Sequence, residues 1–211
     1  MRTLKEAKVV FIDWSGVVSD DRRPVYEANA RMIESKGFQR STFEEWLRQA
    51  KGNPVDLFRS LGIPCTEAEL YTQYQQVFPQ VRNEGIRPIA YPEALPFLKN
   101  VSESRRVIVV SSHPTPFLRE EAIEYGVDRY LHAVHGSELK KAQAIVRALK
   151  NERIRPHEAI FVGDMTHDIY AGHEARVRTI GVTTGYHPRE TLAVALPYLI
   201  VDSLAELQTH L

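Results

Sequence analysis

The sequence lacks the features that mark several broad classes of protein. Its one cysteine, Cys65, cannot form a disulfide within the chain, and no spacing of Cys and His suggests a zinc site. It has no uninterrupted apolar run of about 18 residues, so it offers no candidate membrane span. Its first eight residues do not resemble a secretory signal. The default expectation is a cytoplasmic protein that acts without a membrane.

Net charge of either sign is also absent. Lys plus Arg and Asp plus Glu number 27 each, so the formal net charge is zero and no overall basic field attracts nucleic acid. The 211 residues correspond to between one and two domains at about 150 residues per domain. With 43% of the residues apolar and no internal repeat, the composition is that of an ordinary globular protein. Function must therefore come from local groups of residues.

Five short apolar runs stand out along the chain. Uninterrupted runs of this kind are typical of strands that are covered on both faces, and hence of a parallel sheet. Because helical patterns separate the last four runs, the sequence predicts an α/β fold with a doubly wound parallel sheet. The predicted strands are 9–12, 107–110, 159–162, 179–182 and 198–201, and the predicted helices between them are 117–125, 139–149 and 168–175.

The stretch from 20 to 100 breaks this alternation and contains only helical patterns. The helices are predicted at 25–36, 42–50, 54–61 and 66–78, and a threonine followed by glutamates indicates a capped start near Thr42 and at Thr66. We therefore predict a core domain of residues 1–19 and 101–211 and a helical cap with linkers at 20–100. Such an insertion would lie over the carboxyl end of the first strand, where open α/β sheets bind ligands.

Acidic or small polar residues follow three of the predicted strands. Asp13 follows the first, Ser111 and Ser112 follow the second, and Asp164 with Asp168 follows the third. Taken singly, each could be a helix cap or an acid in a first helical turn. Because the carboxyl ends of parallel strands lie side by side, the three segments together predict one site.

Three segments resemble motifs I, II and IV of the haloacid dehalogenase-like (HAD) hydrolase superfamily. They are Phe11 to Val18, Val109 to Pro114 and Phe161 to Gly172, and the tail from Thr179 to Leu192 is similar to the phosphoglycolate phosphatase branch. The resemblance covers nearly the whole core, whereas the insertion resembles the family's cap only in position and type. It implies a phosphatase that acts on a small phosphorylated metabolite through an aspartyl-phosphate intermediate, with Mg²⁺ as cofactor.

The resemblance implies a nucleophile and a metal site. Asp13 would attack phosphorus, and Asp13, Asp164 and the backbone carbonyl of Ser15 would bind the ion, with Asp168 supporting it directly or through water. Crowded carboxylates and a dianionic substrate would repel one another without a cation. Magnesium meets that need because it takes oxygen ligands from carboxylates, phosphate and water.

The resemblance also implies groups that hold the phosphoryl oxygens. The Ser111 hydroxyl and nearby backbone N–H groups would bind them, with Ser112 beside it. A lysine before the third strand would neutralise the transferring group, and the candidates are Lys140 and Lys141. Lys141 is preferred because it lies four residues before the aliphatic Ile145, as the family's lysine tends to do.

Ser15 departs from the family pattern, which usually has at this position an aspartate that serves as general acid and base. A serine hydroxyl is far too weak an acid to replace it, and losing such a group typically lowers the rate about 100- to 10,000-fold. One interpretation is a phosphatase with a substituted acid, acting slowly, on a good leaving group, or with a proton from water or a cap histidine. Another is a non-enzymatic homologue that binds a phosphorylated ligand or a protein.

A further interpretation comes from the phosphonoacetaldehyde hydrolase branch, whose motif I resembles the run from Asp13 through Trp14 to Val17. Such enzymes cleave a carbon–phosphorus bond after a cap lysine forms a Schiff base, which would make Trp14 and Lys51 substrate-binding residues. The residues around Lys51 do not reproduce the expected lysine motif. A halide-removing enzyme fits less well, because such enzymes work without magnesium. Substrate identity and oligomeric state are not determined by the sequence.

Overall fold

The computed structural model describes residues 4–211, which divide into two compact units. The core unit comprises the described residues through Ser19 together with Ala90–Leu211, and the cap unit is Asp20–Ile89. The chain passes between them at β2 (Ser19–Asp20) and β3 (Ile89–Ala90), which form a separate two-stranded sheet. None of the helices in residues 4–211 has the length and hydropathy needed to cross a membrane.

The core unit is built on a six-stranded parallel sheet with the strand order β5-β4-β1-β6-β7-β8. This confirms the predicted α/β fold. The chain adds strands on one side of β1 and then crosses to the other side, so the winding reverses at β1. Ligand sites of open α/β sheets lie at such a reversal, outside the carboxyl ends of the strands. The strands are β1 (Val9–Ile12), β4 (Arg106–Val110), β5 (Ala133–His135), β6 (Ala159–Gly163), β7 (Arg178–Val182) and β8 (Leu199–Val201).

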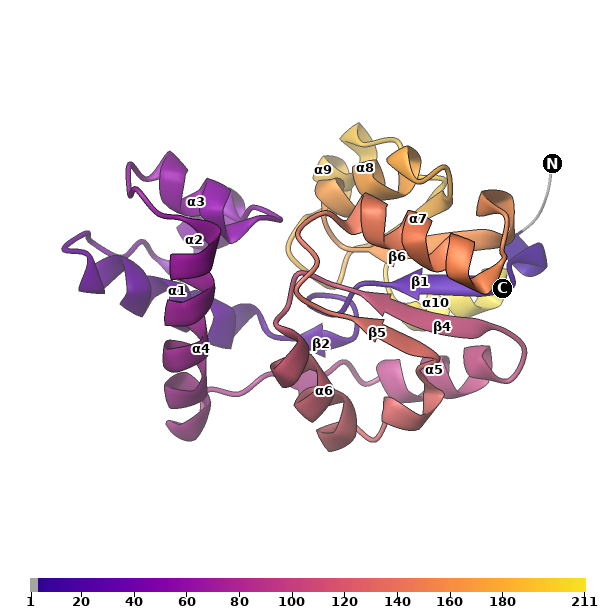
Figure 1. The fold of residues 1–211 in the computed structure, drawn as a ribbon, viewed down its shortest axis with the longest axis horizontal. Coiled ribbons are helices and arrows are strands. Elements are labelled where there is room, and N and C mark those ends of the chain that lie inside the picture. Colours follow the sequence, from indigo (N-terminus) through magenta and orange to yellow (C-terminus); the bar gives the residue numbers. More distant parts are fainter. Residues whose placement is uncertain (1–3) are drawn as a thin grey trace. The chain divides into compact units, whose positions relative to one another are not determined.

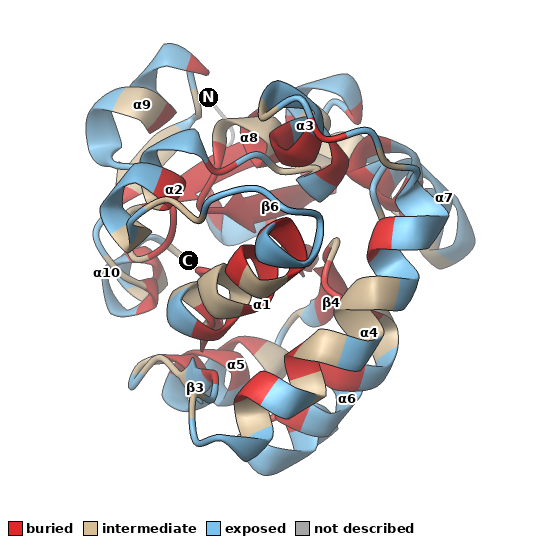
Figure 2. Cartoon of the chain, turned by 90° about the vertical axis from the view of Figure 1, so that its left-hand side faces the viewer, coloured by how far each residue is buried: buried red, intermediate tan, exposed pale blue. Residues whose placement is uncertain are grey.

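Helices cover both faces of this sheet (Figure 1). One face carries α5 (Ala94–Ser102), α6 (Thr115–Glu124) and α10 (Leu204–His210), and the other carries α7 (Lys141–Glu152), α8 (Thr166–Glu174) and α9 (Arg189–Val194). Along β1 the side chains alternate between two apolar clusters, with Val10 and Ile12 in one and Val9 and Phe11 in the other. Burial on both faces explains the uninterrupted apolar runs. Figure 2 shows β4 and β6 as buried, whereas the outer face of α7 is exposed.

Short elements complete the core unit and depart from the sequence-based prediction. Helix α5 begins within the segment 20–100 that the sequence assigns to the cap, yet Phe97 and Leu98 pack in the apolar cluster of the sheet. The division between the units therefore lies at Ile89 and Ala90. Strand β5 has only half-buried residues, so it produces no apolar run. Three short 3₁₀ helices lie at Leu4–Glu6, Asp128–Tyr130 and Pro156–Glu158.

The cap unit contains four helices, which are α1 (Arg22–Ser35), α2 (Phe43–Gln49), α3 (Pro54–Ser60) and α4 (Glu67–Asn83). The predicted threonine starts are confirmed, since Thr42 and Thr66 each form a capping box with the glutamate three residues later. Helix α4 continues past its predicted end at residue 78 and through Pro79. A proline removes one helical hydrogen bond, but burial of Phe78 and Val81 on either side keeps the helix continuous.

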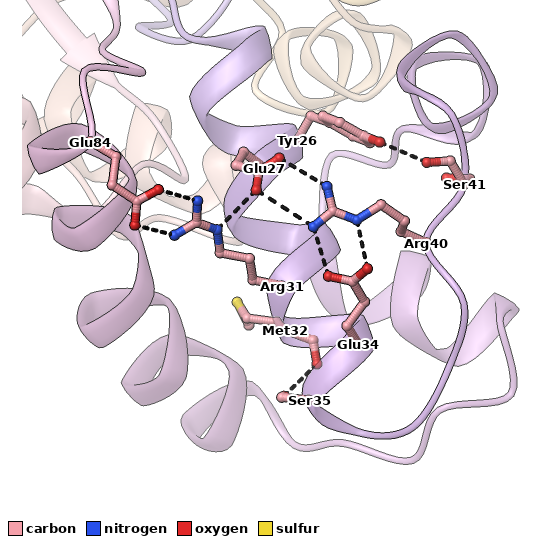
Figure 3. Close-up of polar contacts among 9 residues, drawn as sticks. All are labelled: Tyr26, Glu27, Arg31, Met32, Glu34, Ser35, Arg40, Ser41 and Glu84. Atoms are coloured by element: carbon pink, nitrogen blue, oxygen red, sulfur yellow. Dashed lines mark hydrogen bonds and ion pairs between the residues drawn. The ribbon is translucent and has the colours of Figure 1, made fainter.

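A polar network surrounds α1 of the cap unit (Figure 3). Arg31 forms ion pairs with Glu27 and Glu84, and Arg40 forms ion pairs with Glu27 and Glu34. Water screens exposed pairs of this kind, so they contribute little to stability. We attribute the stability of the cap unit mainly to an apolar cluster of Met32, Ile33, Val55, Phe58, Ile63 and Leu70.

Two isoleucines of the core unit allow a matched test of this packing. Ile108 in β4 has no exposed surface, whereas Ile123 on α6 is 67% exposed. We expect Ile108→Ala to lower the free energy of unfolding by about 2–5 kcal/mol, because it leaves a cavity between sheet and helix. Ile123→Ala should change it by less than about 0.5 kcal/mol. Urea denaturation followed by circular dichroism measures both, and equal losses would contradict the described packing.

Candidate active site

Three carboxylates meet at the carboxyl edge of the sheet. Asp13 follows β1, Asp164 follows β6, and Asp168 lies in the first turn of α8. All three side chains are buried, and each has an oxygen within 4.8 Å of an oxygen of the others. The predicted segments after β1 and β6 therefore lie together in the fold, and β4, which Ser111 follows, pairs in parallel with β1. Below, these three residues are called the acidic cluster.

Lys141, the first residue of α7, reaches into the acidic cluster. Its Nζ donates to Asp13 Oδ2 at 2.6 Å and to Asp168 Oδ1 at 2.7 Å. Burial by itself would lower the pKa of Lys141, but the charges of Asp13 and Asp168 outweigh burial and raise the pKa above its ordinary value. The ammonium is therefore charged. The other candidate, Lys140, is exposed and precedes α7 as its N-cap residue.

Asp164 is the carboxylate of the cluster with a free oxygen. Its Oδ2 accepts a hydrogen bond from the Tyr186 backbone N–H at 2.7 Å, whereas Oδ1 has no donor within residues 4–211. Burial first, and then the charges of Asp168 and Asp13, raise the pKa of Asp164 well above its ordinary value. Such a buried oxygen, next to other carboxylates, is a suitable ligand atom for a hard cation.

Glycines allow the backbone to approach the acidic cluster closely. A Cβ at Gly16 or at Gly185 would overlap the Asp164 carboxylate, and a Cβ at Gly163 would overlap Asp168. Gly16 also has a φ of 74°, a left-handed conformation that favours glycine. Main chain without side chains therefore packs directly against the cluster, and this leaves space for the carboxylate oxygens and for backbone N–H donors.

The structure places the remaining predicted residues in different environments. Ser111 is buried after β4, and its hydroxyl accepts a hydrogen bond from the His113 N–H at 3.2 Å. Ser112 and Ser15 are half-buried. Trp14 is wholly buried within the core unit, and its indole belongs to an apolar cluster. Lys51 is an exposed residue of the cap unit.

The structure adds residues that the sequence reasoning did not assign to the site. Tyr186 contributes its N–H to Asp164, and His187 Nδ1 accepts a hydrogen bond from the Thr166 N–H at the start of α8. Both residues follow β7, the strand next to β6. Residues that follow parallel strands meet at one edge of the sheet, and this holds for β7 as it does for β1, β4 and β6. The sequence could therefore have indicated the segment after β7 as part of the site.

His167 also lies next to the acidic cluster, with Nε2 at 3.2 Å from Asp168 Oδ1. Its side chain is 32% exposed, but both ring nitrogens are buried. Burial, followed by the charge of Lys141, lowers the pKa of His167 to about 3. The imidazole is therefore neutral near neutral pH and adds no positive charge to the cluster.

Substitution of the two neighbouring lysines tests the role of Lys141 in balancing this charge. Lys141→Met leaves Asp13 and Asp168 buried without their cation, so we expect the free energy of unfolding at pH 7 to fall by about 3–5 kcal/mol. The charge of Lys141 lowers the pKa of Asp164, so its removal would raise that pKa further above the unfolded value of about 3.9. A raised carboxyl pKa destabilises the fold increasingly as pH rises above that value, so the deficit should be smaller at pH 5 than at pH 7.

Urea denaturation in EDTA at both pH values measures this deficit. The matched control is Lys140→Met, which should change the free energy of unfolding by less than about 0.5 kcal/mol. A deficit that grows on acidification, or an equal deficit in the control, would show that Lys141 does not balance the carboxylates.

Comparison with known proteins agrees with this geometry. A phosphoglycolate phosphatase of Vibrio vulnificus is 27% identical, and the alignment covers 97% of this chain and 96% of that protein. A phosphoglycolate phosphatase of Nitrosococcus oceani is 26% identical, with 99% and 98% covered. The crystal structure of a predicted phosphatase from Clostridium acetobutylicum superimposes with a TM-score of 0.84 at 20% identity, over 96% of this chain and 97% of that one.

The family model of the haloacid dehalogenase-like hydrolases matches residues 10–182. This range includes β4, β6 and all of β1 but its first residue, and with them all members of the acidic cluster and Lys141. The resemblance that the three sequence motifs indicate is therefore confirmed. The chain belongs to the haloacid dehalogenase-like hydrolase family.

Proposed function

We propose that this protein is a Mg²⁺-dependent phosphatase that hydrolyses a small phosphorylated metabolite through an aspartyl-phosphate at Asp13. The observation that carries the proposal is the buried acidic cluster with the Lys141 ammonium between two of its members. The similarity over nearly the whole chain to proteins named phosphoglycolate phosphatase supports a phosphate ester as the substrate.

The donor set of the cluster suits Mg²⁺. It offers carboxylate oxygens from Asp13, Asp164 and Asp168, and Asp164 Oδ1 receives no hydrogen bond from residues 4–211. Magnesium prefers such hard oxygen ligands. We propose these three residues as its ligands, with the Ser15 backbone carbonyl as a further one. The bound ion would offset the charge of the carboxylates and of a phosphate dianion.

Asp13 is oriented for nucleophilic attack. Its Oδ1 accepts a hydrogen bond from the Trp14 N–H at 2.7 Å, and its Oδ2 contacts Lys141 Nζ. In the proposed reaction an Asp13 oxygen bonds to phosphorus while the bond from phosphorus to the alcohol oxygen breaks, and the alcohol oxygen takes up a proton from water. Water then attacks the same phosphorus, inorganic phosphate leaves, and the carboxylate is restored.

Lys141 and the loop after β4 would hold the phosphoryl oxygens during both steps. The ammonium of Lys141 is fixed by two carboxylates, so it needs little reorganisation as charge develops on those oxygens. The hydroxyl of Ser111 and backbone N–H groups of the same loop would donate hydrogen bonds. Ser112 beside it is half-buried and could contribute its hydroxyl.

Carbon–phosphorus bond cleavage gains no support from the cap lysine. Lys51 is exposed on the cap unit, whereas an amine that forms a Schiff base is usually activated by desolvation or by a neighbouring cation. Phosphate ester hydrolysis is therefore the function that we put forward.

The proposed mechanism is tested by Asp13→Asn. Hydrolysis of 2-phosphoglycolate and of p-nitrophenyl phosphate is measured with Mg²⁺ and with EDTA. We expect the wild type to require Mg²⁺, and the variant to lose activity by about 1,000-fold or more, because the amide cannot replace the nucleophile. Asp128→Asn is the control, since Asp128 is an exposed acid of the same unit. Activity that survives in the Asp13 variant would refute the mechanism.

The missing general acid is tested by Ser15→Asp. A carboxyl at this position would protonate the leaving alcohol, and a general acid typically contributes about 100- to 10,000-fold. We expect at least about a 10-fold increase in kcat for an alkyl phosphate. The increase should be smaller for p-nitrophenyl phosphate, because p-nitrophenolate is a weak base that leaves without a proton.

The measurement that tests the role of Ser15 is therefore the increase in kcat for the alkyl phosphate relative to the increase for p-nitrophenyl phosphate. An equal effect on both substrates would mean that the new carboxyl does not act on the leaving group. A variant that binds Mg²⁺, measured by calorimetry, and shows no activity on either substrate would favour the non-enzymatic, ligand-binding interpretation.

A further inference from the structure

A carboxylate outside the acidic cluster, Glu121 of α6, connects the loops that carry Asp13 and Ser111. Glu121 has no exposed surface. Its Oε2 accepts a hydrogen bond from Trp14 Nε1 at 2.7 Å, and its Oε1 lies 3.1 Å from His113 Nε2. All of these residues belong to the core unit. One side chain thus contacts the loop after β1 and the loop after β4.

Trp14 links Glu121 to the nucleophile. Trp14 directly follows Asp13, and its backbone N–H donates to Asp13 Oδ1 at 2.7 Å. Its carbonyl accepts hydrogen bonds from the N–H groups of residues 17–19, which closes a compact turn. The indole also stacks on Tyr125 with a centroid distance of 5.8 Å and an interplanar angle of 7°. A shift of Trp14 would therefore move the Asp13 carboxylate.

Ser19, at the end of the same turn, strengthens this connection. Its hydroxyl lies 3.3 Å from Glu121 Oε2 and 2.8 Å from the Tyr125 hydroxyl. Tyr125 is the C-cap residue of α6, the helix that contains Glu121. Glu121 and Tyr125 therefore hold both ends of the turn, Trp14 at its start and Ser19 at its end.

His113 links Glu121 to the other loop. The His113 side chain is 2% exposed. Its backbone N–H donates to Ser111 Oγ at 3.2 Å, and its carbonyl accepts from the Ser137 N–H at 2.8 Å. The contact with Glu121 therefore fixes the loop in which Ser111 is proposed to bind the phosphoryl group.

The chemistry of Glu121 suits this double role. Burying a carboxylate without hydrogen bonds is unfavourable, and here both oxygens have partners. An indole N–H can only donate, so the Trp14 side requires an acceptor. A glutamine has a single oxygen, and if that oxygen served Trp14 its NH₂ group would face His113, which would then have to accept a hydrogen bond. Only a carboxylate can accept on both sides.

We infer that Glu121 is a positioning residue of the active site, which holds the nucleophile loop and the phosphate-binding loop at a fixed separation. The inference rests on the proposed phosphatase function. A misplacement of about 1 Å in a catalytic group can lower the rate about 100-fold. Glu121 would thus act on the chemical step through the two loops, since its hydrogen bonds with Trp14, His113 and Ser19 join it to the loops and not to the acidic cluster.

The experiment compares Glu121→Gln, Trp14→Phe and the double variant. Trp14→Phe keeps an aromatic ring but removes the N–H group. Each single variant should lower kcat about 10- to 100-fold and change KM less than about 3-fold, since the loops would be displaced but not lost. Because both substitutions act on the contacts that Glu121 makes with the two loops, the loss of kcat in the double variant should be clearly smaller than the product of the two single losses.

Glu158→Gln is the matched control for a general loss of stability. Glu158 is also a buried carboxylate with cationic partners, Lys8 and Arg155, but it precedes β6 and so lies at the opposite edge of the sheet. It should lower the melting temperature and leave kcat unchanged. Melting temperatures of all variants are measured under the assay conditions.

Three results would overturn the inference. They are an unchanged kcat in folded Glu121→Gln or Trp14→Phe, losses that multiply in the double variant, and an equal loss of kcat in Glu158→Gln. If Glu121→Gln does not fold, Trp14→Phe serves as the test: a lowered kcat supports the inference and an unchanged kcat overturns it. Activity that survives Asp13→Asn would refute the proposed function, and the inference with it. An inactive Asp13→Asn variant together with an unchanged kcat in the Glu121 and Trp14 variants would refute the inference alone.

Discussion

The buried ion pairs of Lys141 with Asp13 and Asp168 are the interaction on which the candidate site depends. Three carboxylates within 4.8 Å of one another repel strongly when they are removed from water. One ammonium offsets only part of that charge, and burial together with the charges of Asp168 and Asp13 raises the pKa of Asp164. The proposed site thus has more carboxylates than cations, which would favour binding of a divalent cation and, with it, of a phosphate dianion.

This balance constrains the surrounding helices. Lys141 is the first residue of α7, where the helix dipole disfavours a cation, so its position is explained by the carboxylates and not by the helix. Asp168 occupies the first turn of α8, where the dipole favours an acid, and its Oδ2 accepts a hydrogen bond from the Met165 N–H. The two helices therefore place opposite charges at the same edge of the sheet, and only one of these placements is locally favourable.

Local patterns in the sequence predict the elements with a clear period or a long apolar run. The strands β1 and β6 and the capping boxes at Thr42 and Thr66 fall in this class, because burial on both faces and cap chemistry act over a few residues. Elements that depend on distant neighbours are harder to predict. Strand β5 is a half-buried edge strand, and α5 lies in a segment of mixed pattern whose place in the core depends on contacts with β4 and α10.

By itself, the sequence determined which residue types end each strand and in which order, and hence that Asp13, Ser111, Asp164 and Asp168 share one edge of a parallel sheet. The family resemblance favoured Lys141 over Lys140, but only the tertiary structure shows that the Lys141 ammonium enters the cluster while Lys140 is exposed. The tertiary structure also shows that Trp14 is buried against Glu121, 107 residues away in sequence. The physical reason is that strand ends follow from local burial patterns, whereas the direction of a side chain and its partner depend on how distant elements pack.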